Sequence, residues 1–131
     1  MSRAVLAAGA VLGGLGVALG AFGAHGLKAV LSADALGWWQ TGLQYQMWHA
    51  LALVSLGLAG RAGTRLPAGL LGAGAAVFSG SLYLMALTGA RWLGAVTPAG
   101  GLLMIAGWFL LAWRAWSGRL AEARAGPPAA D

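Results

Sequence analysis

The sequence predicts an all-α, polytopic integral membrane protein, a bundle of four transmembrane helices. Three observations support this fold class: 60% of the 131 residues are hydrophobic, only 8% are charged, and four apolar stretches are long enough to cross a bilayer. A membrane-spanning helix needs about 20 mostly apolar residues. Soluble domains carry about 25% charged residues, three times the fraction found in this chain.

The first span is expected at residues 4–24, a stretch without a charged side chain. A secretory signal peptide is the alternative, because Ala21 and Gly23 fit a weak small-residue cleavage site. The stretch is longer than the apolar core of a typical signal, so we expect it to be retained as a helix.

The other three spans are expected at residues 38–60, 66–88 and 98–116. Ser32, with Asp34 two residues later, predicts a helix start ahead of the second span. The first turns of that helix would then lie along the membrane interface.

The last span follows the sequence TPAGG. Thr97 suits the capping position of this helix, and Pro98 suits its first helical position. We therefore expect a four-helix transmembrane domain at residues 1–117 and a short polar cytoplasmic tail at residues 118–131.

The basic residues predict the orientation of the chain. Lys28 and Arg91 lie on one side of the four-span arrangement. The other six lie on the opposite side: Arg3, Arg61, Arg65, Arg114, Arg119 and Arg124. Lys and Arg are enriched in cytoplasmic loops, so both termini are expected in the cytoplasm.

The tryptophans suggest depths in the membrane. Tryptophan is enriched at the two bilayer interfaces. Trp38, Trp39 and Trp92 are expected at the outer interface, and Trp113 and Trp116 at the inner one. The two remaining ones, Trp48 and Trp108, are expected to pack inside the membrane.

Glycine spacing in the first span favours close helix packing. Small residues let helix backbones approach each other in lipid. They recur here at positions 9, 13, 16 and 20. We expect this surface to pack within the chain, and self-association into a homo-oligomer through the glycine-rich faces is the alternative.

Charge and motif content argue against several classes of function. The net charge of +5 comes from basic residues scattered between apolar segments, so no nucleic-acid partner is expected. The absence of cysteine excludes disulfides and thiolate sites. The spans hold no pair of carboxylates and no serine–histidine–acid set, which favours a protein without catalytic residues.

Polar side chains gather in the outer half of the spans. Such groups must face partners or water, because burying them unpaired in lipid is costly. Two facing stripes on the second and third spans would enclose a shallow chamber open to the outside, whereas the inner half offers no lining for an ion path. The candidate ligand-binding residues are His25, Gln44, Tyr45, His49, Ser79, Ser81, Tyr83 and Thr97.

The two histidines allow several interpretations. Metal ligation is not expected, because Asp34 is the one acidic residue on the outer side. Axial haem ligation needs matching depths, and the helical rise of about 1.5 Å per residue separates His25 from His49 by about 12 Å. No cofactor is therefore expected. The structural interpretation is that His25 bonds helix ends at the mouth and His49 pairs with a tyrosine or serine, and proton handling or ligand binding remains the alternative.

Four stretches in order resemble the family known as domain of unknown function 423. They are ALGAFGAHGLK, WWQTGLQYQMWHALAL, FSGSLYLMALTG and TPAGGLLMIAGW. This family includes bacterial YgdD-like proteins and is similar to eukaryotic transmembrane protein 256. The resemblance implies a bacterial inner-membrane protein and implies no reaction or ligand. Its signature positions here include Gln40 and Gln46 besides the candidate residues.

Together these observations favour a small membrane protein, without catalytic residues, whose polar outer half binds a small ligand, a lipid or a partner protein. One alternative is a small oligomeric transporter or channel. The other is a redox accessory protein that holds haem or quinone.

Overall fold

Four helices form the chain in the computed structural model, which describes residues 1–120. They are α1 (Arg3–Phe22), α2 (Ala33–Ala59), α3 (Arg65–Thr88) and α4 (Thr97–Trp116). A π-helix, η1 (Gly23–Leu27), continues α1, and a 3-10 helix, η2 (Arg91–Ala95), precedes α4. The predicted all-α fold class is confirmed. Arg124 and most of the predicted tail lie outside the described residues.

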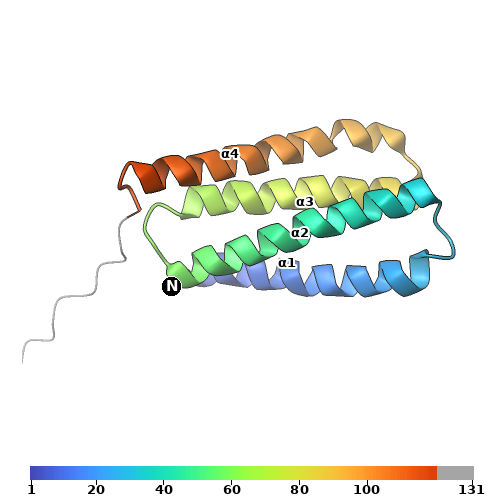
Figure 1. Cartoon of the computed structure of the whole chain (residues 1–131), viewed down its shortest axis with the longest axis horizontal. Coiled ribbons are helices and arrows are strands. Elements are labelled where there is room, and N and C mark those ends of the chain that lie inside the picture. The colour runs from blue at the N-terminus through green and yellow to red at the C-terminus, as the bar shows by residue number, and fades with distance from the viewer. Residues whose placement is uncertain (121–131) are drawn as a thin grey trace, which may run out of the picture.

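The helices pack in the order of the chain (Figure 1). α2 contacts α1 and α3, and α4 contacts α3, so α1 and α4 form the two edges of the arrangement. The start of α1 and the end of α4 lie at the same end of the molecule, which we call the terminal end (Figure 1). The opposite end holds η1 and η2, and we call it the η end.

Local signals set the helix boundaries. The Ser32 hydroxyl accepts a hydrogen bond from the Ala35 backbone N–H at 3.2 Å, which is the predicted cap. The second helix therefore begins at Ala33, ahead of the expected span at 38–60. α2 and α3 end at Gly60 and Gly89, whose φ angles of 60° and 70° lie in the left-handed region that favours glycine.

The expected cap at Thr97 is not formed. α4 begins at Thr97 itself, and no side chain caps this helix. The Thr97 hydroxyl lies 3.2 Å from the Leu93 carbonyl and 2.7 Å from the Ser81 hydroxyl. It is thus used between helices. Pro98 was expected at the first helical position and is the second residue of α4, still within the first turn, which tolerates proline.

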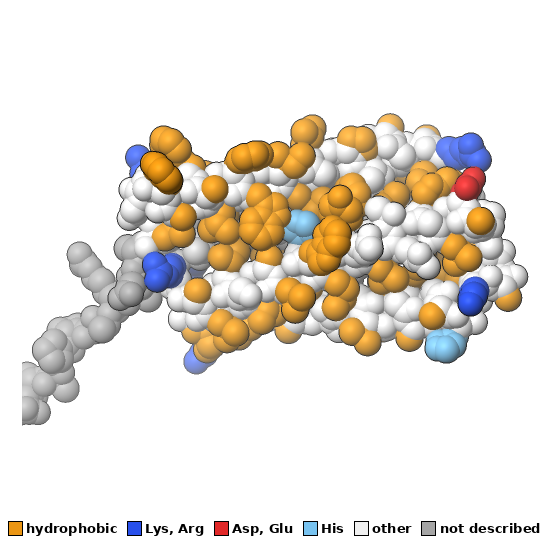
Figure 2. Space-filling model, viewed as in Figure 1, with side chains coloured by type: hydrophobic (Ala, Val, Ile, Leu, Met, Phe, Trp, Pro, Cys, Tyr) orange, Lys and Arg blue, Asp and Glu red, His pale blue; other side chains and the backbone are white. Residues whose placement is uncertain are grey.

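The helices suit a membrane. Three helical segments are long and apolar enough to span it, at Arg3–Leu27, Arg65–Thr88 and Arg91–Trp116, with mean hydropathies of 2.1, 1.7 and 1.7. α2 has 27 residues and a more polar sequence, and it lies between α1 and α3. Hydrophobic side chains cover the length of the viewed face, and Lys and Arg side chains lie toward its two ends (Figure 2).

Glycines bring the helix backbones into direct contact. A Cβ atom added at Gly9 of α1 would lie 2.6 Å from the Val54 backbone nitrogen of α2. One added at Gly57 of α2 would lie 2.6 Å from the Leu6 Cα. Gly74 approaches the Gly100 carbonyl of α4 in the same way, at 2.8 Å. Close backbone packing of this kind stabilises the helix contacts through van der Waals attraction. It is needed because the hydrophobic effect does not drive helix association in lipid.

We predict that Gly57→Ala lowers the free energy of unfolding by about 1–3 kcal/mol, because the added methyl group must push the α1 backbone away. Gly80→Ala is the matched control, since a Cβ there meets no atom within 4 Å. Thermal unfolding in a neutral detergent measures both. Equal stability of the two variants would contradict the close α1–α2 contact.

Candidate functional site

Two hydrogen bonds join α2 to α1. The Trp39 indole Nε1 donates to the Leu19 carbonyl at 3.1 Å. The Gln46 amide nitrogen donates to the Leu12 carbonyl at 2.8 Å. Trp39, which the sequence predicts at the depth of the outer interface, is buried between helices with 2% of its surface exposed. Gly23 permits this, because a Cβ there would lie 2.7 Å from the indole Cδ1.

Two more hydrogen bonds join α2 to α3. The Tyr83 hydroxyl donates to the Gln46 side-chain oxygen at 2.7 Å. The Ser79 hydroxyl donates to the Gly42 carbonyl, also at 2.7 Å. A Cβ at Gly42 would lie 2.9 Å from the Tyr83 ring, so glycine allows the tyrosine to approach α2. Tyr83 also packs on Trp39, with ring centroids 4.6 Å apart.

His49 connects α2 with α4. Its Nδ1 lies 2.7 Å from the Tyr45 carbonyl, and the Trp108 indole donates to its Nε2 at 3.1 Å. Nε2 must therefore accept, which assigns the proton to Nδ1 in the neutral tautomer. The expected partner was a tyrosine or serine side chain. The actual donor is Trp108, which the sequence suggested only as a packing residue.

The eight candidate residues differ in their environments. His49, Ser79 and Ser81 are buried, and Tyr45, Tyr83 and Thr97 are half-buried. His25 and Gln44 are exposed. Among the candidates, Ser81 contacts Thr97, and His49 contacts the Tyr45 carbonyl. Ser79 and Tyr83 bond residues of α2 outside the candidate set, and His25 and Gln44 lie outside these contacts.

Gln46 is the central polar residue that the candidate set omitted. Only 4% of its surface is exposed, while Gln44 faces outward. The buried face of α2 follows Trp39, Gly42, Gln46 and His49. The candidate Gln44 lies on the exposed face of the same helix. Two glutamines two residues apart on a helix lie on opposite faces, so one of Gln44 and Gln46 must face away from the interior. The sequence signal for the buried face was Gly42, one turn before Gln46.

His25 lies in η1 at the η end, and no hydrogen bond of its imidazole is recorded among residues 1–120. The expected bond from His25 across the mouth is thus not formed in the described chain. His49 lies near the middle of α2 and uses both ring nitrogens. Axial ligation of haem by His49 would have to break its bond with Trp108. Within the described residues no group of three His, Cys, Asp or Glu side chains could hold a metal ion.

The interhelical polar side chains find partners in one another or in backbone carbonyls. We call them the polar network: Trp39, Gln46, His49, Ser79, Ser81, Tyr83, Thr97 and Trp108. Among residues 1–120, no buried side-chain nitrogen or oxygen lacks a partner. The network therefore seals the helices together where the sequence suggested an open chamber. Toward the terminal end the interior is apolar, with Leu53, Ala68 and Leu71 packed together.

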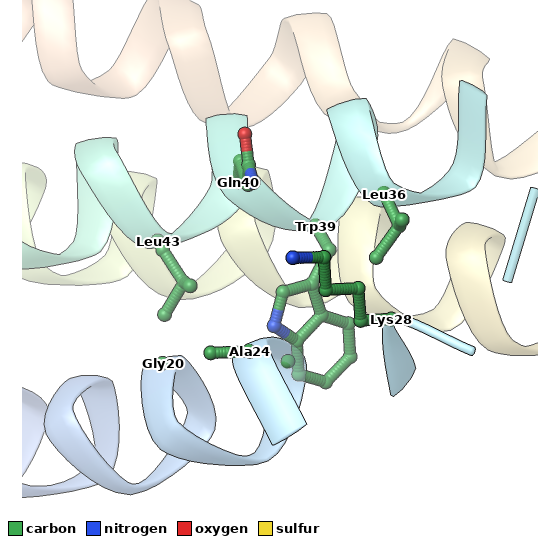
Figure 3. Close-up of a pocket in the computed structure, with 8 residues that line it drawn as sticks. Gly20, Ala24, Lys28, Leu36, Trp39, Gln40 and Leu43 are labelled. Atoms are coloured by element: carbon green, nitrogen blue, oxygen red, sulfur yellow. The ribbon is translucent and has the colours of Figure 1, made fainter. Parts of the chain in front are cut away.

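An open pocket lies beside this network, between α1, η1 and α2. Its volume is about 270 Å³, and it is lined by Gly20, Gly23, Ala24, Lys28, Leu36, Trp39, Gln40 and Leu43. Lys28 and Gln40 supply polar groups at an otherwise apolar surface (Figure 3). None of the eight candidate residues lines it. The sequence signal for this pocket was Lys28, the first cation after Arg3, directly following the glycine-rich end of the first span.

Comparison with known proteins gives a family of membrane proteins. The model of the family described as "Protein of unknown function (DUF423)" matches residues 19–101. A UPF0382 membrane protein of Staphylococcus haemolyticus is 48% identical over 106 residues, which cover 79% of this chain and 87% of the relative. The UPF0382 inner membrane protein YgdD of Escherichia coli K12 is 43% identical over 114 residues, or 84% and 87% of the two chains. No solved structure matches.

We predict that Tyr83→Phe lowers the free energy of unfolding by about 0.6–1.7 kcal/mol, the range of single hydrogen bonds between helices in membranes. The cause is loss of the donor to Gln46. Tyr45→Phe is the matched control, because the described structure records no hydrogen bond of the Tyr45 hydroxyl. Denaturant unfolding in detergent measures the difference.

A double-mutant cycle tests the division of the network. Gln46→Leu with Tyr83→Phe should cost less than the sum of the single losses, because both remove the same bond. His49→Leu with Tyr83→Phe should be additive to within about 0.5 kcal/mol, since these side chains have separate partners. Strong coupling in the second pair would contradict this division.

Proposed function

Because the chain belongs to the membrane-protein family described as protein of unknown function (DUF423), we propose for it a role within the bilayer: it binds a lipid in the pocket between α1 and α2 and catalyses no reaction. The observation that carries this proposal is the pocket's amphiphilic lining. Gly20, Ala24 and Leu43 give an apolar wall, and Lys28 offers an ammonium group at its edge.

The lining matches the two parts of a lipid. Apolar pockets with a few placed polar groups are the usual form of a small-ligand site. An acyl chain would lie against Gly20 and Leu43, and the Lys28 ammonium would attract an anionic headgroup oxygen. The Gln40 amide adds a donor and an acceptor beside that headgroup.

The polar network fixes the position of Trp39, which forms part of the pocket wall. Trp39 forms the pocket lining and is held by the Leu19 carbonyl on one side and the Tyr83 ring on the other. Tyr83 is held in turn by Gln46. A site whose walls are already fixed loses less conformational entropy on binding. In this proposal Tyr83 and Ser79 position the pocket, and Lys28 and Gln40 contact the ligand.

We further propose that the protein lies in a bacterial inner membrane with both termini in the cytoplasm. Relatives are named inner membrane proteins. Within the described chain, Arg3, Arg61, Arg65, Arg114 and Arg119 belong to the terminal end, against Lys28 and Arg91 at the η end. This asymmetry supports a cytoplasmic terminal end, and with that orientation the pocket would lie in the outer leaflet.

The proposed orientation has a direct test, because the chain contains no cysteine. We predict that Ala95→Cys in η2 reacts with a membrane-impermeant maleimide added to intact bacterial spheroplasts, whereas Ala62→Cys in the α2–α3 turn reacts only after lysis. Both positions are exposed. The reverse labelling pattern would invert the proposed topology.

We predict that Gly20→Leu reduces the amount of lipid that co-purifies with the protein. The leucine side chain would enter the pocket, while its Cβ makes only an ordinary contact with Leu43 at 3.9 Å. Gly14→Leu is the matched control on the same helix, because a Cβ there meets nothing within 4 Å and the residue lines no recorded pocket. Native mass spectrometry from a neutral detergent measures retained lipid.

Lys28→Gln completes the test with a change of charge. We expect it to reduce retention of anionic lipids more than that of zwitterionic lipids, because the ammonium group recognises the headgroup. Lipid retention that is the same in the wild type, Gly20→Leu and Lys28→Gln would refute the proposed site.

A further inference from the structure

The terminal end holds a second pocket, with a strongly basic lining. Its volume is about 590 Å³, and it lies where the start of α1, the α2–α3 turn and the end of α4 meet. Arg61, Arg65 and Arg114 all line it. Arg114 donates a hydrogen bond to the Gly63 carbonyl in the α2–α3 turn. Its guanidinium group is therefore directed toward the segment that carries Arg61 and Arg65. Three cations therefore border one cavity.

The described chain offers this cavity no negative charge. Asp34 is the one acidic residue within residues 1–120, and it lies in the first turn of α2 at the η end. Two helices, α1 and α3, begin at the terminal end, and two others, α2 and α4, end there, so their dipoles offset each other. The positive potential at this pocket comes from its arginines. The pocket is therefore suited to an anion.

An apolar groove adjoins the basic pocket. It has a volume of about 610 Å³ and runs between α1 and α3 over Leu53 of α2. Small residues form its walls, among them Ala4, Ala8, Gly69 and Gly72. These residues leave space between the two helices, which α2 holds apart. Arg65 lines both the groove and the basic pocket.

We infer that this end of the protein binds an anionic glycerophospholipid, with the phosphate at Arg61, Arg65 and Arg114 and one acyl chain in the groove between α1 and α3. Guanidinium groups bind phosphate oxygens through paired hydrogen bonds. Basic pockets between transmembrane helices suit anionic headgroups. Arg65 lines both spaces, so it lies where the headgroup and the acyl chain of one lipid would join. A free anion would need only the basic pocket, and a hydrocarbon would need only the groove. This site is separate from the pocket beside Trp39.

The test measures binding of dioleoyl phosphatidylglycerol and dioleoyl phosphatidylcholine to the purified full chain by native mass spectrometry. The wild type should bind dioleoyl phosphatidylglycerol more tightly than dioleoyl phosphatidylcholine. Arg61→Gln combined with Arg65→Gln should weaken binding of dioleoyl phosphatidylglycerol about 25-fold, from about fivefold per arginine near an anionic surface. These substitutions keep Arg114 and its bond to Gly63. Arg91→Gln at the η end is the matched control and should change binding less than about twofold.

A second arm separates a lipid from a free anion. Inorganic phosphate and soluble glycerophosphate should fail to displace the lipid at equal concentration, because they lack the acyl chain. Gly69→Leu should reduce binding of the dioleoyl lipid by filling the groove, since a Cβ at Gly69 meets no atom within 4 Å. Ala73→Leu offers the same test at a second exposed position of the groove.

Three outcomes would overturn the inference. Equal effects of the arginine pair and Arg91→Gln would indicate general surface charge. Complete displacement by inorganic phosphate would indicate an anion site without a lipid. Unchanged lipid binding by the variant that combines Arg61→Gln with Arg65→Gln would show that the basic pocket does not bind the lipid. In the Gly20→Leu background, in which the pocket beside Trp39 is filled, the arginine pair should still weaken binding of the remaining lipid, so failure here is distinguishable from failure of that pocket.

Discussion

The side chain of Gln46 is the contact on which the rest of the structure depends. Its amide nitrogen donates to the Leu12 carbonyl of α1, and its oxygen accepts from Tyr83 of α3. One side chain thus joins three helices at a buried position. In lipid an unpaired amide is costly, so this residue holds the helices in one register with respect to each other.

Glycine and hydrogen bonding act together at each interface. Gly42 lets Tyr83 reach α2, Gly23 admits the Trp39 indole, and Gly57 lets the start of α1 lie on α2. Close backbones shorten the distance between polar side chains and carbonyl acceptors, and the resulting bonds hold the backbones close. Within residues 1–120, open space lies between α1 and its neighbours and at the terminal end.

Much of the architecture could be predicted from the sequence. The membrane class follows from composition, and the family follows from four stretches in order. The Ser32 cap was predicted because capping is local. Three features were missed: neighbouring helices bury Trp39, Trp108 is a donor to His49, and Gln46, not Gln44, faces the interior. Each depends on which face of a helix meets its neighbour.

The sequence by itself determined that the chain is a helical membrane protein with polar residues in one half of its spans. Composition and hydropathy suffice for that, because the bilayer requires helices with internally paired backbones. Only the tertiary structure decided which polar atoms meet, since helix rotation moves a side chain from the interior to the lipid face without changing its depth. The same rotation decided that Lys28 and Arg65 border pockets, because a pocket exists only where two helices fail to fill the space between them.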